Sequence, residues 1–276
     1  MRIPICCILL LAFVGFSHGN VVSPRLCGGQ VFVEDSVVIE ISSAHEKCHW
    51  YIQTQEDRIL VFTVLNGNLK EAQDFLAIHD GSNIDSPILR VENQKIHERS
   101  RKDLPASVYT TQSTASVRFT KAPNSNLKLK IQKAIDCPFN LGTESQCGRV
   151  VDAVSCYCAT FTKRNHLSQR SYCNSHNMKL LSLETYEKEI SIHNAWGNEA
   201  LFLTSLTDEP NEGTWFWEST DTMLYPGYSN WCSKQPDNSA AFGGEDCMMI
   251  NSGANGCWND CDCDKDVSDA ICQALP

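Results

Sequence analysis

The residues best suited to chemistry are oxygen-bearing side chains near the carboxy terminus, namely Gln235, Asp237, Glu245, Asn259 and Asp260. Calcium takes about six to eight hard oxygen ligands from carboxylates, amides and carbonyls. These side chains therefore predict a calcium site. The alternative interpretation is a polar, solvated loop whose acids only keep the protein soluble.

A second group has the spacing of a zinc protease, because residues 45–49 read His-Glu-Lys-Cys-His, a literal H-E-x-x-H. That spacing chelates zinc when both imidazoles lie on one face of a helix. Residues 37–41 and 50–52 instead indicate strands on both sides. On a strand, residues four apart lie roughly 13 Å from each other, too far to share one ion. We predict that the chain is not a protease, and no other catalytic arrangement is recognisable.

Length and composition set the frame for these groups. The chain has 276 residues, of which 42% are hydrophobic, which favours two folded domains. It carries 23 Lys and Arg against 33 Asp and Glu, a formal charge of −10. A net acidic chain argues against nucleic acid as a partner, because binding a phosphate backbone needs clustered cations.

The amino terminus has the pattern of a secretory signal peptide over residues 1–19. Arg2 precedes the apolar stretch 5–16, and Ser17-His18-Gly19 supplies small residues for cleavage after Gly19. The apolar run is shorter than the roughly 20 residues that span a bilayer, so no membrane insertion is expected. Fifteen cysteines also favour an oxidising compartment. We expect a secreted, extracellular protein.

Charge and cysteine counts divide the remaining chain near Asp136. Residues 20–136 carry 14 acids and 14 bases, whereas residues 137–276 carry 19 acids and 8 bases. The first part has two cysteines and the second has eleven. Two modules of different construction are therefore expected, joined by a short hinge.

The first module is predicted to be an all-β sandwich. Residues 31–33, 37–41, 59–64 and 127–131 are β-branched or alternate apolar with polar side chains. Turn residues separate these runs, and many short strands with such spacing favour a sandwich.

This module resembles a CUB domain over residues 27–135. The resemblance lies in Cys27-Gly28-Gly29, in 48–52 (Cys-His-Trp-Tyr-Ile) and in 74–81 (Asp-Phe-Leu-Ala-Ile-His-Asp-Gly). It implies a Cys27–Cys48 disulfide. The second cysteine pair of that family is absent, and Thr120-Lys121 replaces the Ser-Asp step used for calcium. A calcium site in this module is therefore incomplete.

The second module is predicted to be α+β. Helices are expected over 165–177 and 184–194, and residues 200–203 look like a strand. Its motifs resemble those of a C-type lectin domain over residues 137–274. They are Tyr172-Cys173, Gly213-Thr214-Trp215-Phe216-Trp217, Trp231, Gln235-Pro236-Asp237, Glu245-Asp246-Cys247, Trp258-Asn259-Asp260 and Ala270-Ile271-Cys272.

The lectin resemblance implies a Ca²⁺ cofactor held by the same five side chains, with Pro236 in a cis bond. It also implies sugar binding through two adjacent hydroxyls. In that family Gln-Pro-Asp goes with galactose-type sugars and Glu-Pro-Asn with mannose-type sugars. The order here predicts galactose, with Phe242 as the ring that stacks on the sugar. The upstream triplet Glu209-Pro210-Asn211 is interpreted as loop.

A second, auxiliary calcium site is implied by residues that match acidic positions in some lectins. They are Asp208, Glu212 and Asp246 together with Glu245, and Asn238 stands where an acid is often found. The alternative is a loop held only by hydrogen bonds.

The cysteines of the second module are paired by the same resemblance. It implies Cys173–Cys272 and Cys247–Cys263, and Cys137–Cys147 as an amino-terminal hairpin bridge. Cys156, Cys158, Cys232, Cys257 and Cys261 are left, with Cys232–Cys257 and Cys232–Cys261 both open. The odd cysteine suggests a bridge to another chain, or a free thiol.

Together these patterns predict a secreted lectin that recognises galactose-type glycans on cell or microbial surfaces, as in innate immunity. A single sugar site is weak, so a homo-oligomer formed through the CUB-like module or the odd cysteine could supply avidity. The alternative is a protein-binding extracellular adaptor that uses the lectin fold without sugar or calcium.

Overall fold

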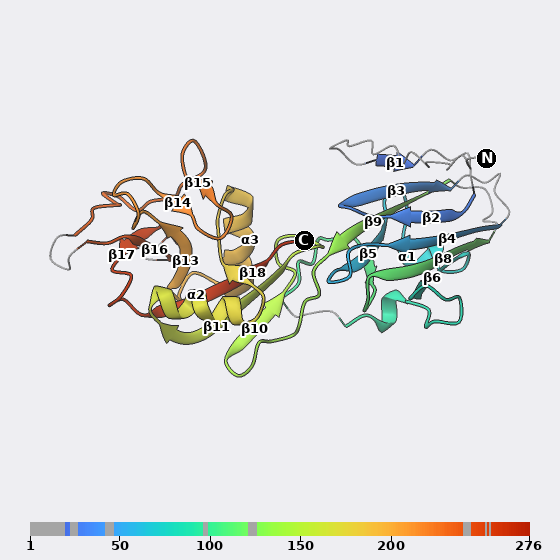
Figure 1. The fold of residues 1–276 in the computed structure, drawn as a ribbon, viewed down its shortest axis with the longest axis horizontal. Coiled ribbons are helices and arrows are strands. Elements are labelled where there is room, and N and C mark those ends of the chain that lie inside the picture. The colour runs from blue at the N-terminus through green and yellow to red at the C-terminus, as the bar shows by residue number, and fades with distance from the viewer. Residues whose placement is uncertain are drawn as a thin grey trace, which may run out of the picture.

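A computed structural model places the chain in two lobes that follow each other along its long axis (Figure 1). It describes residues 20–22, 27–41, 47–95, 99–120, 126–239, 244–251, 253 and 255–276. The predicted signal peptide lies outside these residues. Within the described part of the chain, no helix has the length and apolar character needed to cross a membrane.

The N-terminal half contains two facing sheets and very little helix. The five-stranded sheet has the order β1 (Asn20–Val22), β3 (Ser36–Ile41), β9 (Leu127–Ala134), β5 (Ile59–Val64) and β7 (Ser107–Tyr109). The four-stranded sheet has the order β2 (Gly29–Phe32), β4 (Lys47–Gln53), β8 (Thr114–Thr120) and β6 (Leu76–Asp80). In the described part of this half, α1 (Leu69–Ala72) and a 3-10 turn (Val91–Asn93) are the helical segments.

Alternating side chains of both sheets form one core in this half. Strand β3 buries Val37, Ile39 and Ile41, and β8 buries Val117 and Phe119 in the same cluster. Side chains two apart on a strand share a face, so the predicted alternation places these residues between the sheets. The predicted strands over 37–41, 59–64 and 127–131 are present. The CUB resemblance itself remains a prediction.

The segment that carried the H-E-x-x-H spacing forms a strand wherever it is described. Cys48 and His49 lie on β4, which pairs with β8 along its whole length. Cys48 is bonded to Cys27, and His49 Nε2 lies 2.7 Å from Ser116 Oγ. The remaining members, His45 and Glu46, lie outside the described residues. Strand β4 does not give the helical face that a zinc protease needs.

The C-terminal half is built on a nine-stranded sheet with two helices. Its main path runs β10 (Ser145–Gly148), β11 (Cys156–Arg164), β18 (Ser268–Ala274), β13 (Phe202–Thr207), β14 (Phe216–Trp217) and β15 (Thr222–Met223). Strand β12 (Lys179–Leu180) pairs with β18, β16 (Cys247–Ile250) pairs with β13, and β17 (Asn259–Cys261) pairs with β16.

Both predicted helices of this half are present, with side-chain caps that explain where they begin. Helix α2 (His166–Ser175) starts after Asn165, whose Oδ1 accepts the Ser168 N–H at 3.1 Å. Helix α3 (Tyr186–Trp196) starts after Thr185, whose Oγ1 accepts the Lys188 N–H at 3.1 Å. Such caps satisfy N–H groups that have no partner inside the helix.

Six disulfides join cysteines of the described residues, and they correct one predicted pair. The structure contains the predicted disulfides Cys27–Cys48, Cys173–Cys272 and Cys247–Cys263. Of the two partners that the sequence left open for Cys232, the bonded one is Cys257. The predicted Cys137–Cys147 bridge is wrong, because the bonds are Cys137–Cys156 and Cys147–Cys158. The reason is strand pairing, since the β10–β11 register sets Cys147 directly opposite Cys158. Cys137 is then bonded to the next free sulfur on β11.

Cys261 is the free cysteine among the described residues, and it is 1% exposed. Burial is the main cause that raises the pKa of its thiol well above the usual value, and neighbouring acids add to it. A buried thiol without an exposed sulfur does not reach another chain. The interpretation of the odd cysteine as an intermolecular bridge is therefore wrong for this residue.

A short segment of the N-terminal half, residues 99–104, docks on the C-terminal half. Arg99 Nη1 donates to the Ala195 carbonyl near the end of α3 at 2.7 Å, and its Nε donates to Gln146 Oε1 at 3.1 Å. Gly148 lies against the Arg99 backbone, where an added Cβ would come within 3.0 Å. Arg101 adds its own bonds, with its N–H donating to the Arg149 carbonyl at 3.1 Å.

We expect Arg99→Ala to loosen this docking, because it removes two hydrogen bonds, one of them to a helix carbonyl without an intrahelical partner. The loss should lower the free energy of unfolding of the docked segment by about 1–3 kcal/mol. Faster amide hydrogen exchange over residues 99–104 would report it. Arg118→Ala, at an exposed arginine on β8, is the control. Unchanged exchange in Arg99→Ala would contradict the docking.

Candidate calcium and carbohydrate site

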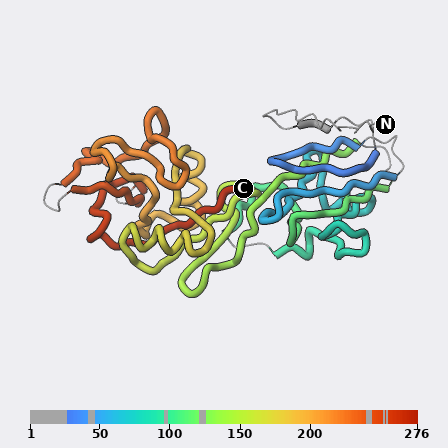
Figure 2. The backbone as a smooth tube through the Cα atoms, viewed as in Figure 1, coloured from blue at the N-terminus to red at the C-terminus, as the bar shows by residue number. Residues whose placement is uncertain are grey.

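The predicted ligands lie in the loops at the end of the molecule remote from the N-terminal half (Figure 2). Gln235, Asp237 and Glu245 belong to the long connection between β15 and β16, and Asn259 and Asp260 belong to β17. The Gln235-Pro236 peptide bond is cis. The β16–β17 pairing sets Asp260 opposite Met248. Strand β17 therefore lies beside β16, the strand into which the connection leads, and this brings the predicted ligands of the connection and of β17 together.

Three carboxylates converge there. Ligand atoms of Asp237, Glu245 and Asp260 all lie within 4.8 Å of one another. Asp237 is exposed, Glu245 is half-buried and Asp260 is fully buried. Like charges held this close repel each other, so the arrangement favours a cation among them.

Backbone N–H groups hold the carboxylates in place. Asp260 Oδ2 accepts the N–H groups of Asp237 at 2.9 Å and Asn238 at 2.7 Å. Glu245 Oε2 accepts the Ser239 N–H at 3.0 Å. Asn238 in turn accepts the Glu245 N–H through its Oδ1 at 2.8 Å. One oxygen of Asp260 is thereby used to shape the loop, which leaves the other for a ligand.

Two side-chain oxygens at this site lack hydrogen-bond partners. Gln235 Oε1 and Asp260 Oδ1 are buried, and neither has a hydrogen-bond partner among the described residues. A buried polar atom without a partner costs free energy, which a bound cation would offset. Burial is also the main cause that raises the pKa of Glu245 and of Asp260. The donor set is all oxygen, which fits calcium.

Two further predicted residues are placed differently. Asn259 is half-buried on β17, and its Nδ2 donates to the Asp260 carbonyl. Its Oδ1 therefore remains the atom that it could offer to an ion. Phe242, the predicted stacking ring, lies outside the described residues.

The residues predicted for an auxiliary calcium surround a buried aspartate. Asp208 is 1% exposed, and its Oδ2 accepts the Gly213 N–H at 2.8 Å while its Oδ1 has no partner in the described structure. The pKa of Asp208 is raised to about 6, mainly by burial and to a smaller extent by the nearby charges of Glu212 and Asp246. The side-chain oxygen of Asn238 already accepts the Glu245 N–H. The triplet at 209–211 forms an exposed turn, as expected.

A residue that the sequence analysis missed supports the site from behind. Glu189 on α3 is 1% exposed and accepts hydrogen bonds from Tyr228 Oη at 2.8 Å, Asn230 Nδ2 at 2.9 Å and Trp258 Nε1 at 3.2 Å. Trp258 directly precedes Asn259, and Tyr228 and Asn230 lie in the same connection as Gln235. A glutamate in a polar helix gives no sequence signal of burial, so only the packing reveals this role.

The two chain segments that Glu189 contacts are also joined to each other. The Cys232 N–H donates to the Trp258 carbonyl, and the Trp258 N–H donates to the Asn230 carbonyl, both at 2.8 Å. The Cys232–Cys257 disulfide closes the same junction. The base of the ligand loop is therefore fixed on α3 and on β17 together.

Comparison with known proteins identifies this half. Residues 162–274 match the family model "Lectin C-type domain". The chain therefore carries a C-type lectin domain in its C-terminal half.

Two known proteins are similar to parts of the chain. The mouse (Mus musculus) protein "C-type lectin domain family 10 member A" is 29% identical over 194 residues, which cover 63% of this chain and 62% of that protein. The chain thus spans less than two thirds of that relative. The "Type-2 ice-structuring protein" of Osmerus mordax is 39% identical over 49 residues, 18% of this chain and 25% of that protein.

Among solved structures, the human scavenger receptor C-type lectin carbohydrate-recognition domain is 28% identical. The match covers 44% of this chain and 92% of that domain, with a TM-score of 0.39.

Proposed function

We propose that this protein is a secreted, calcium-dependent lectin that binds galactose-type sugars without altering them. The observation that carries the proposal is the convergence of Asp237, Glu245 and Asp260 beside buried oxygens that lack partners. They lie in a domain that matches the Lectin C-type family model. We also propose that export, a CUB-like N-terminal half and recognition of cell or microbial glycans belong to this function.

In this proposal Gln235, Asp237, Glu245, Asn259 and Asp260 hold a calcium ion through side-chain oxygens. When bound, the ion supplies a positive centre that two adjacent sugar hydroxyls can coordinate. The protein's own carboxylates accept hydrogen bonds from those hydroxyls, and its amides donate to them. The backbone bonds to Asp260 and Glu245 keep these groups oriented before the sugar arrives.

The order Gln235-Pro236-Asp237 carries the galactose preference. An amide precedes the proline and a carboxylate follows it, so the donor and the acceptor lie on fixed sides of the ion. The reverse order would satisfy the opposite arrangement of hydroxyls. Phe242 is proposed as the ring that covers the apolar face of the sugar.

The proposal is tested by retention of the purified protein on immobilised galactose and mannose. We expect calcium-dependent retention on galactose, and release by a chelator or by free galactose. The double substitution Gln235→Glu with Asp237→Asn should shift retention toward mannose. Retention of the unaltered protein on mannose alone would contradict the proposed preference but not the lectin.

The second candidate is an extracellular adaptor that binds protein through the lectin fold, without sugar or calcium. The exposed aromatic residues Tyr186 and Tyr225 of the C-terminal half are an observation in its favour, because exposed tyrosines are common in protein interfaces. Binding to a protein partner that persists in a chelator, together with no retention on a wide glycan panel, would favour it.

A further inference from the structure

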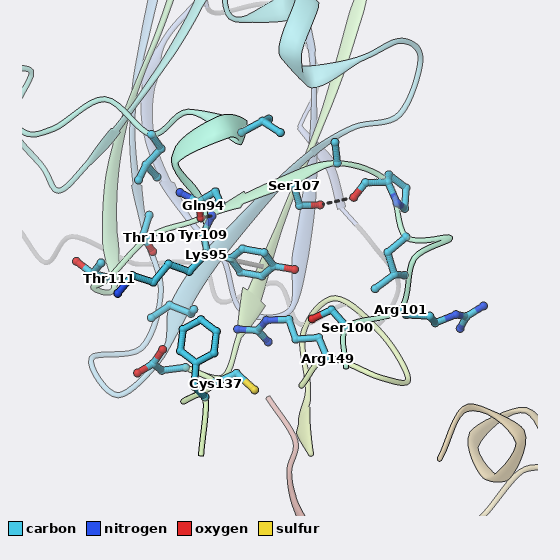
Figure 3. Close-up of a pocket in the computed structure, with 18 of the residues that line it drawn as sticks. Gln94, Lys95, Ser100, Arg101, Ser107, Tyr109, Thr110, Thr111, Cys137 and Arg149 are labelled. Carbon is cyan, nitrogen blue, oxygen red and sulfur yellow. Dashed lines mark hydrogen bonds between the residues drawn. The ribbon is translucent and has the colours of Figure 1, made fainter. Parts of the chain in front are cut away.

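A pocket of about 720 Å³ lies where the two halves meet, away from the lectin loops. We call it the junction pocket. Most of its lining comes from the N-terminal half, and Cys137, Phe139 and Arg149 come from the C-terminal half. Figure 3 shows Tyr109 and Arg149 side by side in its middle, with Lys95 and Thr111 toward one end. Its volume lies in the range of small-molecule sites, which often form between domains.

Several apolar side chains line the junction pocket, and together we call them its apolar wall. Ile59, Leu89 and Leu104 contribute aliphatic side chains, and Phe139 contributes a ring that is 49% exposed. Burying apolar surface of a ligand against such a wall is favourable in proportion to the area removed from water. The wall therefore selects a ligand with an apolar body, which a sugar does not have.

The charged side chains of the pocket are almost all basic. Its lining includes Lys95, Lys102 and Arg149, and Asp136 is the lining carboxylate among the described residues. The fourth cation, Arg101, is already paired, because its Nε and Nη2 donate to the two carboxylate oxygens of Asp103. In a chain whose formal charge is −10, this local excess of positive charge stands out. It favours an anionic ligand.

Arg149 gives that charge a fixed position. It is 6% exposed, and its guanidinium lies 4.4 Å from the centre of the Tyr109 ring. It donates to two backbone carbonyls, Ile135 at 2.6 Å and Ser155 at 3.3 Å. Within the described residues it forms no ion pair with a carboxylate. Asp136 and Asp152 attract this guanidinium without forming an ion pair with it, so its charge is only partly balanced and a ligand anion would balance it further.

We propose that the junction pocket binds a small amphipathic anion, with its apolar body against the apolar wall and its acid head toward Arg149. The head is a carboxylate or sulfonate, since a guanidinium recognises both as planar or forked acceptors. This site is separate from the proposed sugar site and uses none of its residues. Because both halves line it, the ligand would also stabilise their docked arrangement.

The test uses the full secreted chain and the fluorescent probe 8-anilinonaphthalene-1-sulfonate, which joins an aromatic body to one sulfonate. We expect saturable binding that decanoate displaces, whereas decanol, which lacks the charge, and sulfate, which lacks the body, do not. Displacement should be the same with calcium and with a chelator. Equal competition by decanol and decanoate, or no displacement by decanoate, would overturn the proposal.

Two variants assign the binding to this pocket. Lys95→Glu with Lys102→Glu should weaken decanoate binding by about tenfold or more, because two attractive charges become repulsive. The matched control reverses two exposed lysines elsewhere, Lys70→Glu with Lys163→Glu, and should bind as the unaltered protein does. Leu104→Asn tests the apolar wall and should weaken decanoate more than butyrate. Equal affinity of all variants, with thermal melts showing them folded, would place the probe elsewhere and refute the site.

Discussion

Asp260→Asn is expected to abolish calcium-dependent retention on galactose and to weaken calcium binding by about tenfold or more. The substitution keeps the size of the side chain and one oxygen for the N–H groups of Asp237 and Asn238. It removes the negative charge and the second oxygen, Oδ1, which lacks a partner in the described structure. Isothermal titration with calcium, followed by galactose affinity chromatography, measures both effects.

The same variant should have the opposite effect on the calcium-free protein. Asp237, Glu245 and Asp260 repel one another when no cation is present, so removing one charge should leave thermal stability equal or raise it. Asp221→Asn, at an exposed acid outside the cluster, is the control and should change neither property. Unaltered calcium affinity in Asp260→Asn would contradict the site, whereas loss of folding without calcium would contradict the explanation by charge.

Glu189→Leu should destabilise the C-terminal half by about 3 kcal/mol or more, because it leaves Asn230 Nδ2 and Trp258 Nε1 buried without an acceptor. For a domain of this size the melting temperature should fall by roughly 10 °C. Differential scanning calorimetry measures it. Calcium affinity should fall as well, since these donors fix the two segments that carry the proposed ligands.

Glu189→Gln separates the hydrogen bonds from the charge. The glutamine oxygen can still accept from Asn230 and Trp258, and its amide can donate to Tyr228 Oη, whose hydroxyl can turn to accept. We therefore expect Gln to preserve most of the stability and the calcium affinity that Leu loses. Equal loss in both variants would show that the carboxylate charge, and not the hydrogen-bond geometry, holds the loop.

The sequence predicted the parts of this structure that depend on local pattern. The alternation in 37–41 and 127–131 marks strands because every second side chain must enter the core. Helices α2 and α3 begin close to their expected starts because Asn165 and Thr185 are good caps. The converging carboxylates were also predicted, because Gln235-Pro236-Asp237, Glu245-Asp246-Cys247 and Trp258-Asn259-Asp260 together resemble the motifs of C-type lectin domains.

What could not be predicted depends on contacts between distant segments. The Cys137–Cys147 pair was wrong because the register of β10 on β11, and not spacing along the chain, decides which sulfurs meet. Glu189 was missed because its three partners lie 39, 41 and 69 residues away in sequence. The sequence gives no signal that Arg149 is buried against Tyr109 of the other half.

The docking of residues 99–104 on the C-terminal half has a mechanical consequence. With Arg99 bonded to the end of α3, the two lobes are docked on each other and are not connected by the linker alone. If the loops of the candidate site bound a surface, the N-terminal lobe would be held at a fixed distance from that surface, because the site lies at the opposite end of the molecule. Neighbouring copies on one surface would then present that lobe in the same orientation, so sideways association between them would cost little rotational entropy.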